Sequence, residues 1–278
     1  MEEQMTKVVL ITGASSGIGR ACAEALAAGP YTVYGTSRRP QPDPAVENGK
    51  SEVHMLQMNV NETSSVEASV ETILEQQGRI DIVVNNAGFG YGGAVEDTSV
   101  DEAKATFETN LFGPLRVCRA VLPAMRAQGS GLIVNISSIG GRMGLPFQGL
   151  YSASKFALEG LSESLRMEVK SFGIDVVLLE PGDIRTSFTA NRRLTAACRT
   201  HAAYREQCDT TLAKIEDDEQ NGAPPQLVAK TLMHIVQHPH PRPRYIAGRF
   251  YEKLAVRLKD LLPDGLFERI LMLNYGMK

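Results

Sequence analysis

The stretch Lys7-Val-Val-Leu-Ile-Thr-Gly-Ala-Ser-Ser-Gly-Ile-Gly19 decides the fold. Its first half is a continuous apolar run, typical of a strand buried on both faces of a parallel sheet. Its three glycines let the backbone turn sharply before a helical stretch that we expect over residues 17–28. Free N–H groups at the N-terminus of such a helix stabilise a phosphate, so the turn predicts a dinucleotide site rather than an unliganded bend.

Strands and helices alternate along the rest of the chain. Apolar runs predict strands over residues 7–12, 32–37, 53–58, 80–84, 132–136, 175–179 and 244–247. Further helices are expected over residues 102–127, which Pro114 and Pro123 should interrupt or bend, and over residues 151–171. This alternation predicts one doubly wound α/β domain over residues 1–278, with helices on both faces of a parallel sheet.

Composition argues against several classes of protein. The chain has 278 residues, 43% of them apolar, and a net charge of -3, so it can bury a sizeable core and gives no support to nucleic-acid binding. Residues 1–7 are polar and acidic, unlike a signal peptide. No apolar run approaches the roughly 20 residues that a membrane span needs. We therefore expect a cytoplasmic protein.

The spacing of cysteines and histidines argues against disulfides and metals. The four cysteines, at positions 22, 118, 198 and 208, have no CxxC spacing, so we expect free thiols. His234, His238 and His240 superficially resemble metal ligands, but prolines follow them and no carboxylate or cysteine lies near. We expect no metal site.

Tyr151 and Lys155 are the strongest candidates for proton transfer. They lie four residues apart at the start of a predicted helix, so both side chains project from one face. A free tyrosine has a pKa of about 10, and a neighbouring ammonium would lower it toward neutrality. Ser138, at the end of a predicted strand, could hold a substrate oxygen beside the tyrosine, and its neighbour Ser137 is the competing candidate.

The spacing of these motifs resembles the short-chain dehydrogenase/reductase family. Gly13-x3-Gly17-x-Gly19, Asn85-Asn-Ala-Gly88, Tyr151-x3-Lys155 and Pro181-Gly182 follow the family's order over residues 7–187. The resemblance implies a Rossmann-type fold of seven parallel strands and a nicotinamide dinucleotide as cofactor. The residues expected to contact that cofactor are Gly13, Ser15, Ser16, Gly17, Ile18, Gly19, Ser37, Arg38, Asn59, Val60, Asn86, Ala87, Gly88, Tyr151, Lys155, Pro181, Gly182, Ile184 and Thr186.

The resemblance also implies a role for each reacting residue. Hydride passes from the nicotinamide to a carbonyl carbon, Tyr151 protonates the oxygen, and Lys155 and Asn110 feed a proton relay. The positive oxidised nicotinamide would help Lys155 to stabilise the phenolate. The family's spacing favours Ser138 over Ser137. Asn110 lies within a predicted helix, which asparagine disfavours, and a simple buried polar tie is the alternative role.

The resemblance implies further cofactor contacts, and two of them have alternatives. The family more often has aspartate where this chain has Asn59, so the backbone of Val60 is an alternative contact for the adenine. Asn85 could contact the cofactor or tie the strand end to its neighbours. Ile184 would offer its backbone N–H, and Thr186 its side chain, to the nicotinamide carboxamide.

The end of the second predicted strand favours NADPH over NADH. Gly35-Thr-Ser-Arg-Arg39 has no carboxylate to hold ribose hydroxyls, and the next acidic residue is Asp43. An arginine can pair bidentately with a 2′-phosphate, so we expect Arg38 to make the main contact, assisted by Ser37 and Arg39. Surface arginines in an NADH enzyme are the alternative.

The substrate side is less specific. Residues 187–222 are expected to form a substrate-binding loop and helices, with the acidic run 217–219 as a solvated loop, and residues 90–93 and 143–147 as other walls. Aromatic and aliphatic residues there suggest a hydrophobic ketone or aldehyde, although loop packing explains them equally well.

Residues 249–278 form an amphipathic extension. It resembles the branch with 17β-hydroxysteroid and retinol dehydrogenases, and it could pack on the fold, join subunits or touch a membrane surface.

These features predict an NADPH-dependent oxidoreductase that reduces a carbonyl to an alcohol. An NAD-linked alcohol dehydrogenase working oxidatively is the first alternative, and a non-catalytic dinucleotide sensor is the second. The family resemblance implies a homodimer or homotetramer joined through helices at 111–127 and 151–171.

Overall fold

Strand β1 (Lys7–Ile11) lies inside the sheet, and its apolar sequence covers both faces. Val9 and Ile11 belong to one buried cluster, whereas Val8 and Leu10 belong to another on the opposite face. This computed structural model describes residues 6–39, 52–189, 191–198 and 200–277. Because both faces of β1 are apolar, the strand requires helices on either side.

The main sheet has seven parallel strands. Their spatial order is β3 (Val53–Gln57), β2 (Tyr31–Ser37), β1, β4 (Ile82–Asn85), β6 (Gly131–Ile136), β7 (Ile174–Pro181) and β9 (Arg244–Ala247). Val9 of β1 pairs with Val33 of β2 on one side and with Ile82 of β4 on the other. The strand order reverses between β1 and β4, the switch point at which such sheets bind ligands. The predicted fold class and the seven strands are confirmed.

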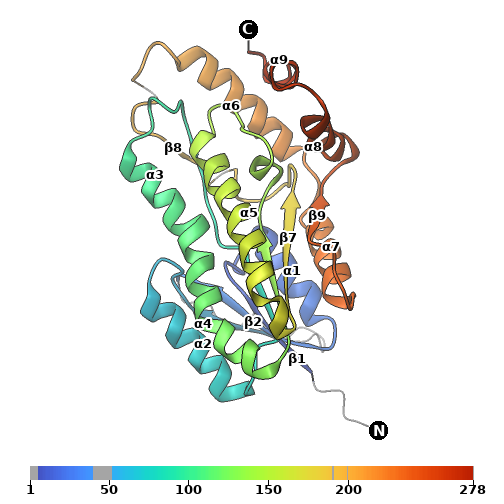
Figure 1. Ribbon diagram of the computed structural model, residues 1–278. Coiled ribbons are helices and arrows are strands. Elements are labelled where there is room, and N and C mark those ends of the chain that lie inside the picture. The colour runs from blue at the N-terminus through green and yellow to red at the C-terminus, as the bar shows by residue number, and fades with distance from the viewer. Residues whose placement is uncertain (1–5, 40–51, 190, 199, 278) are drawn as a thin grey trace.

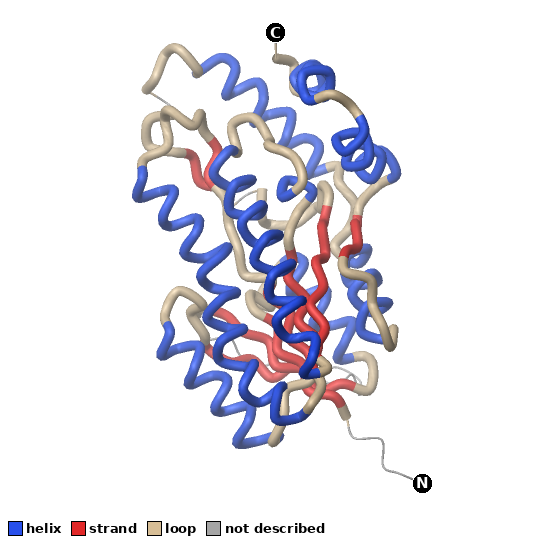
Figure 2. The backbone as a smooth tube through the Cα atoms, in the orientation of Figure 1, coloured by secondary structure: helices blue, strands red, loops and turns tan. Residues whose placement is uncertain are grey.

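Helices cover both faces of this sheet (Figures 1 and 2). Helices α1 (Gly17–Ala27) and α7 (Gln226–Gln237) pack on one face. The opposite face is covered by α2 (Thr63–Gln77), α4 (Gly113–Gln128) and α5 (Gly149–Val169). Figure 1 shows α6 (Arg205–Gln220), α8 (Phe250–Leu261) and α9 (Asp264–Asn274) beyond the carboxyl end of β7.

The helix expected over residues 102–127 is interrupted at a place different from the one predicted. Helix α3 (Val100–Phe107) leads into a π-helical turn, η1 (Glu108–Phe112), and then into α4. Pro114 lies in the first turn of α4, directly after η1. Pro123 lies inside α4. The interruption therefore precedes both prolines.

The acidic run 217–219 was predicted to be a solvated loop, and this prediction is wrong. The run forms the C-terminal part of α6. Glu219 packs inward, where Arg192 binds its carboxylate at 2.5 Å. The two short strands β5 (Tyr91–Gly92) and β8 (Arg193–Leu194) were not expected, and they pair in parallel beside α6. Two 3-10 turns, η2 (Ile139–Gly141) and η3 (Lys170–Phe172), flank α5.

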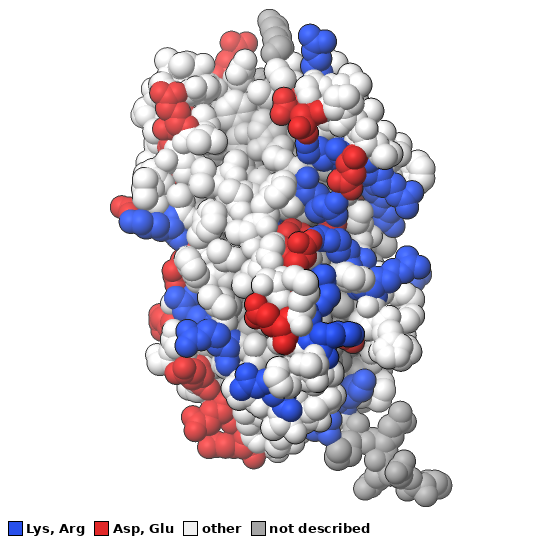
Figure 3. Space-filling model, viewed as in Figure 1, with Lys and Arg blue, Asp and Glu red and all other residues white. Residues whose placement is uncertain are grey.

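The face formed by α3 and α5 has a broad uncharged band (Figure 3). Phe156 and Met167 of α5 are 45% and 74% exposed, and Phe112 and Phe172 beside them are also exposed. Lys, Arg, Asp and Glu surround this band rather than cross it. The face therefore differs from an ordinary solvated surface.

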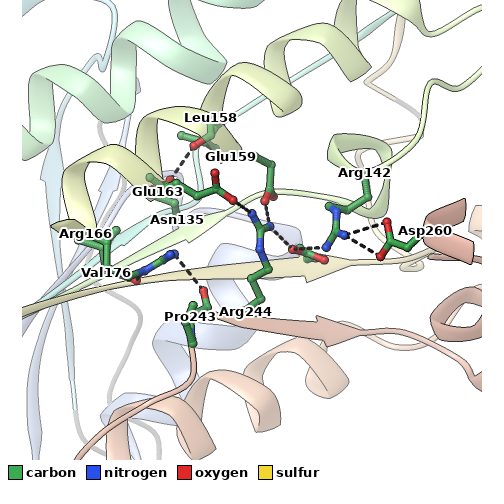
Figure 4. Close-up of polar contacts among 12 residues, drawn as sticks. Asn135, Arg142, Leu158, Glu159, Glu163, Arg166, Val176, Pro243, Arg244 and Asp260 are labelled. Atoms are coloured by element: carbon green, nitrogen blue, oxygen red, sulfur yellow. Dashed lines mark hydrogen bonds and ion pairs between the residues drawn. The ribbon is translucent and has the colours of Figure 1, made fainter. Parts of the chain in front are cut away.

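An ion network joins α5, β7, β9 and α8 (Figure 4). Arg244 of β9 contacts Glu180 at 2.8 Å and Glu163 at 2.5 Å, and it also binds Glu159. Arg142, just after η2, lies 3.0 Å from Asp260 of α8. The network thus connects the C-terminal helices to α5.

Candidate functional site

A cavity of about 710 Å³ lies at the carboxyl end of the sheet. The segments that follow β1, β2, β4, β6 and β7 all reach it, as the switch-point rule requires. Eighteen of the predicted site residues line it: Gly13, Ser15, Ser16, Gly17, Ile18, Ser37, Arg38, Val60, Asn86, Ala87, Gly88, Ser138, Tyr151, Lys155, Pro181, Gly182, Ile184 and Thr186. Gly19, Asn59 and Asn110 are not part of the lining.

The turn after β1 is shaped for a phosphate. Gly13 and Gly17 have positive φ values of 67° and 55°, which L side chains rarely adopt. A Cβ at Gly19 would lie 2.3 Å from the carbonyl oxygen of Gly13, so only glycine allows helix α1 to start this close to the turn. Ser15, Ser16 and Gly17 present the N-terminus of α1 to the cavity. This arrangement fits the pyrophosphate of a dinucleotide.

The two asparagines after β4 stabilise the ends of the strands. Asn86 Nδ2 donates to the carbonyl of Thr12 at 2.9 Å, and Thr12 Oγ1 accepts from the backbone N–H groups of Asn86 and Ala87. Asn85 is buried, and its Nδ2 donates to Asn135 Oδ1 at 2.8 Å. Asn85 does not line the cavity, so the geometry favours a structural tie for it.

Arginines are grouped where β2 ends. Ser37, Arg38 and Arg39 line the cavity, and both arginines are exposed. Ser37 Oγ accepts from the backbone N–H of Arg39 at 3.3 Å, which holds the turn in place. No carboxylate among the described residues lines the cavity beside them. Asp43 lies outside the described residues. The site fits an anionic group at this end.

Asn59 is turned away from the cavity. Its Nδ2 donates to Glu62 at 2.6 Å, and its Oδ1 accepts from the backbone N–H of Asn61. Val60 and Asn61 line the cavity in its place. The alternative contact through Val60 therefore agrees better with the geometry, and Asn61 was missed because no motif marks it.

Tyr151 projects from the first turn of α5 into the cavity, where it hydrogen-bonds to Ser138. The Ser138 hydroxyl also accepts from the backbone N–H of Gly140 at 3.0 Å, so its position is fixed. Ser137 lines the same cavity, but its buried Oγ has no hydrogen-bond partner among the described residues. The geometry therefore favours Ser138, the serine that lies beside Tyr151.

The pKa of Tyr151 differs from the sequence expectation. Burial raises the pKa of Tyr151 to about 12, Glu219 adds to this rise, and the Ser138 hydrogen bond and Arg192 oppose it. Lys155 was expected to lower this pKa. Its Nζ donates instead to the carbonyl of Ile136 at 2.9 Å and lies 5.8 Å from the centre of the Tyr151 ring. At neutral pH the phenol is therefore protonated.

Lys155 is itself strongly perturbed. Its side chain is 5% exposed, and burial lowers the pKa of Lys155 to about 8. A lysine with such a pKa exchanges its proton near physiological pH. This property suits a proton relay.

Asn110 is buried beneath the cavity, in η1. Its Nδ2 donates to the carbonyl of Phe89 at 2.8 Å and to Ser154 Oγ at 3.0 Å, and its Oδ1 accepts from the backbone N–H of Phe89 at 3.0 Å. These contacts tie the segment after β4 to α5. Asn110 thus makes the buried polar tie that was the alternative to a role in the proton relay.

The segment after β7 presents backbone groups to the cavity. Asp183 O accepts from Ala223 N, and Arg185 N donates to Ala223 O, both at 2.9 Å. The N–H of Ile184, between them, has no hydrogen-bond partner among the described residues. Thr186 Oγ1 accepts from the backbone N–H of Phe188 at 3.1 Å and lines the cavity. Both residues can therefore meet a carboxamide.

A buried ion pair beside the tyrosine was missed by sequence reasoning. The side chains of Arg192 and Glu219 are 7% and 13% exposed, and Thr189 Oγ1 donates to the same carboxylate at 2.5 Å. Glu219 lines the cavity. The only sequence feature that could have pointed to this pair was the acidic run 217–219, and such a run is equally typical of a solvated surface.

Acidic side chains and the C-terminal extension also line the cavity. Asp183 lines the cavity, and its burial beside Glu252 of α8 raises the pKa of Asp183 to about 7. Tyr275, after α9, also lines the cavity, and burial raises its pKa above the usual range. The extension over residues 249–278 therefore takes part in the cavity wall, which its amphipathic pattern did not reveal.

The described part of the chain offers neither a metal-binding group nor a membrane-spanning helix. The described residues contain no group of three His, Cys, Asp or Glu side chains placed to bind a metal. None of the helices in the described ranges is long and apolar enough to cross a bilayer.

Two relatives are similar in sequence to most of this chain. The chain is 42% identical over 273 residues to the 3-ketodihydrosphingosine reductase of Bacteroides thetaiotaomicron, which covers 98% of this chain and 99% of that protein. It is 35% identical over 276 residues to human 17-beta-hydroxysteroid dehydrogenase type 1, covering 93% of this chain and 82% of that protein.

A solved structure and a family model also match this chain. A short-chain dehydrogenase from Streptomyces avermitilis superposes with a TM-score of 0.78 at 34% identity, covering 98% of this chain and 96% of that one. The family model described as short chain dehydrogenase matches residues 7–197. The chain therefore belongs to the short chain dehydrogenase family of oxidoreductases, which act on carbonyl and alcohol groups with a nicotinamide dinucleotide.

Proposed function

We propose that the protein reduces a hydrophobic ketone or aldehyde to an alcohol with NADPH, and that Tyr151 donates the proton. The observation that carries this proposal is the Tyr151 phenol, which is protonated at neutral pH, faces the cavity and hydrogen-bonds to Ser138. The 42% identical relative is named as a reductase of a ketone, over almost the whole length of both chains. Reduction is favoured as the direction because the phenol is protonated at neutral pH, the form from which a proton can pass to the substrate oxygen.

The cofactor would be held at positions that the chain provides. The turn from Gly13 to Gly19 would bind its pyrophosphate, and the backbone of Ile184 and the side chain of Thr186 would meet its carboxamide. When bound, the reduced nicotinamide supplies a hydride to the carbonyl carbon.

Side chains of this protein would supply the proton and bind the substrate oxygen. The hydroxyls of Ser138 and Tyr151 converge on one point of the cavity, where they can hold a substrate oxygen and share the charge that develops on it. Tyr151 then passes its proton to that oxygen. Lys155, with its pKa of about 8, can return a proton toward the tyrosine. Ile139, Leu145 and Phe188 line the cavity and exclude water around an apolar substrate.

A carbonyl panel with a tyrosine variant tests the reaction. The wild type should consume NADPH with at least one member of a panel of fatty aldehydes, long-chain ketones, steroids, retinoids and quinones. Tyr151→Phe should lose at least about 100-fold in kcat, because general acid catalysis contributes about that much. It should still bind NADPH. Tyr251→Phe, on the exposed side of α8, is the matched control and should keep full turnover. Normal turnover in Tyr151→Phe would overturn the role of this residue.

Arg38 is proposed as the main contact for the 2′-phosphate. Arg38→Asp should reverse the preference for NADPH, because a carboxylate repels that phosphate and accepts from ribose hydroxyls. Kd values for NADPH and NADH, measured by fluorescence, give the ratio directly. An unchanged ratio would overturn the role of Arg38, whereas a wild type that binds NADH more tightly than NADPH would favour the NAD-linked alcohol dehydrogenase.

A dinucleotide sensor without catalysis is the other alternative. Hydride transfer to any carbonyl of the panel eliminates it. Binding of NADPH without transfer to any panel member would support it.

A further inference from the structure

Gln148 lies in the cavity next to the reacting residues. It is the N-cap residue of α5, three positions before Tyr151, and lines the cavity together with Ser138 and Tyr151. Side chains three residues apart at a helix start are neighbours, about 5–6 Å apart at Cβ. A substrate oxygen held by Tyr151 would therefore lie close to the amide of Gln148.

The Gln148 amide is buried without a partner. The side chain is 4% exposed, and its Nε2 has no hydrogen-bond partner among the described residues. It does not cap its own helix, although N-cap side chains commonly do so. Buried amide N–H groups are nearly always paired in folded proteins, so this donor indicates a missing acceptor.

The backbone around Gln148 holds this amide in place. Its N–H donates to Leu145 O at 3.1 Å, and its carbonyl accepts from Ser152 N at 2.9 Å. The preceding residue, Phe147, has a φ of 56°, the only positive value of a non-glycine residue within the described part of the chain. Its carbonyl accepts from Gly93 N at 2.8 Å. Strained backbone of this kind often accompanies functional sites.

The neighbours of Gln148 in the cavity are apolar. Leu145 and Ile139 line the same wall, and Phe188 lies 5.8 Å from Tyr151 between ring centres. An amide donor among such neighbours gives a substrate both a polar contact and a hydrophobic surface. Ligand sites commonly combine many apolar groups with a few fixed polar ones.

We propose that Gln148 determines specificity by donating a hydrogen bond from Nε2 to a second oxygen of the substrate. We take that oxygen to be a hydroxyl or carbonyl one or two carbons from the reacting carbonyl, because Gln148 and Tyr151 lie within one helical turn of each other. The substrate class is an apolar chain that ends in a hydroxy ketone or a related dioxygenated group. This inference rests on the proposed reductase activity.

A matched pair of ketones tests the inference. Decan-3-one and 1-hydroxydecan-3-one share the reacting group and the apolar chain, and only the second offers an acceptor to Gln148. The wild type should favour the hydroxy ketone by at least about tenfold in kcat/KM, because a site built to hydrogen-bond a hydroxyl rejects an analogue that lacks it. Gln148→Met keeps the length of the side chain and removes the donor, so the ratio should fall close to one. Gln237→Met, at the exposed end of α7, is the control and should keep the wild-type ratio.

Thermal unfolding distinguishes a substrate contact from a structural role. Removal of an unpaired buried donor should leave the Tm of Gln148→Met equal to that of the wild type or higher. A structural hydrogen bond would produce the opposite shift. A lower Tm, or a weaker Kd for NADPH with the substrate preference intact, would overturn the proposal.

Measurements on the wild type alone show which of the two proposals has failed. If it reduces no carbonyl of the panel, the reductase function fails. If it reduces decan-3-one as efficiently as the hydroxy ketone, or reduces other panel members but neither of the pair, only the role of Gln148 fails.

Discussion

Tyr151 and Lys155 are neighbours whose pKa values shift in opposite directions for the same reason. Burial raises the pKa of Tyr151 to about 12 and lowers that of Lys155 to about 8. In each case the neutral form is favoured, because the surroundings solvate a charge poorly. A protonated phenol and a lysine that titrates near pH 8 are therefore present together in one cavity.

Lys155→Met should stabilise the protein at neutral pH. The folded pKa of Lys155 lies below the unfolded value of 10.5, so the unfolded state binds more protons between pH 8 and 10.5. The destabilisation by the buried ammonium is complete below pH 8 and disappears as the pH rises through this window. Its magnitude is roughly 3 kcal/mol. Tm values across pH 6–10 should show the largest advantage of the variant below pH 8.

The exposed Lys230 on α7 provides the control for this prediction. Lys230→Met should show no such pH-dependent change in Tm. An advantage of Lys155→Met that grew above pH 8 would contradict the assigned pKa direction.

Sequence reasoning found the residues whose roles follow from local spacing. Tyr151 and Lys155 share a helix face because they are four apart, and the glycines of the first turn precede a helix start. Gln148 stands on the same turn and was missed, since glutamine has no characteristic role there. Arg192 and Glu219 could not be paired, because their contact joins residues 27 apart through the packing of α6.

The π-helical turn η1 is the element that positions Asn110. One extra residue per turn lets the asparagine leave the helix ladder and bridge Phe89 to Ser154. The sequence showed only that asparagine was unfavourable there. A π-turn is frequent at functional sites, and here it places a polar side chain directly beneath the cavity.

Asn110→Ala should destabilise the fold by about 2–4 kcal/mol, because it leaves the N–H and the carbonyl of Phe89 buried without partners. Urea unfolding followed by circular dichroism measures this change. The control Asn221→Ala removes an exposed side chain at the end of α6 and should cost less than about 1 kcal/mol. Equal losses in the two variants would exclude a special role for the η1 bridge.

The ion network around Arg244 connects elements from the whole molecule. Its carboxylates come from α5 and β7, and Glu180 is fully buried. Removal of one member of a buried network leaves its partners uncompensated. The C-terminal helices and the reacting helix α5 therefore depend on the same group of charges.

Arg244→Met should destabilise the protein by about 3–5 kcal/mol, because Glu159 and Glu180 then lose their main cation. Arg20→Met is the matched control, since the Arg20–Glu24 pair is more than half exposed and should contribute less than about 1 kcal/mol. Chemical denaturation of both variants gives the comparison. A small effect of Arg244→Met would show that the network is not a stabilising unit.

We propose that the uncharged face over α3 and α5 joins two copies of the chain. Phe156 and Met167 of α5 are 45% and 74% exposed, and α5 is one of the two helices through which the family resemblance implied an interface. Phe156→Asp should convert an assembly to monomers in sedimentation velocity, because a carboxylate would be buried without a partner. Leu261→Asp on α8, where the leucine is 78% exposed, should leave the assembly intact. A wild type that sediments as a monomer would exclude this interface.

The overall fold was predictable from the sequence because its elements repeat a simple pattern. Each buried strand is a continuous apolar run, and the order of the runs predicts a doubly wound sheet. The pattern weakens after Thr186, where α6 carries charges along most of its length. Its helical structure depends on inward contacts such as Arg192–Glu219, which composition cannot reveal.

The thiols of Cys198, which follows β8, and of Cys208, in α6, lie 3.2 Å apart within one buried cluster. Both are buried, and burial raises the pKa of Cys208 to about 12, so Cys208 is a poor nucleophile in the folded protein. An alkylating reagent can reach them only when this cluster opens. Their rate of modification thus reports how often the cavity wall formed by β8 and α6 opens, and a bound substrate should slow this modification.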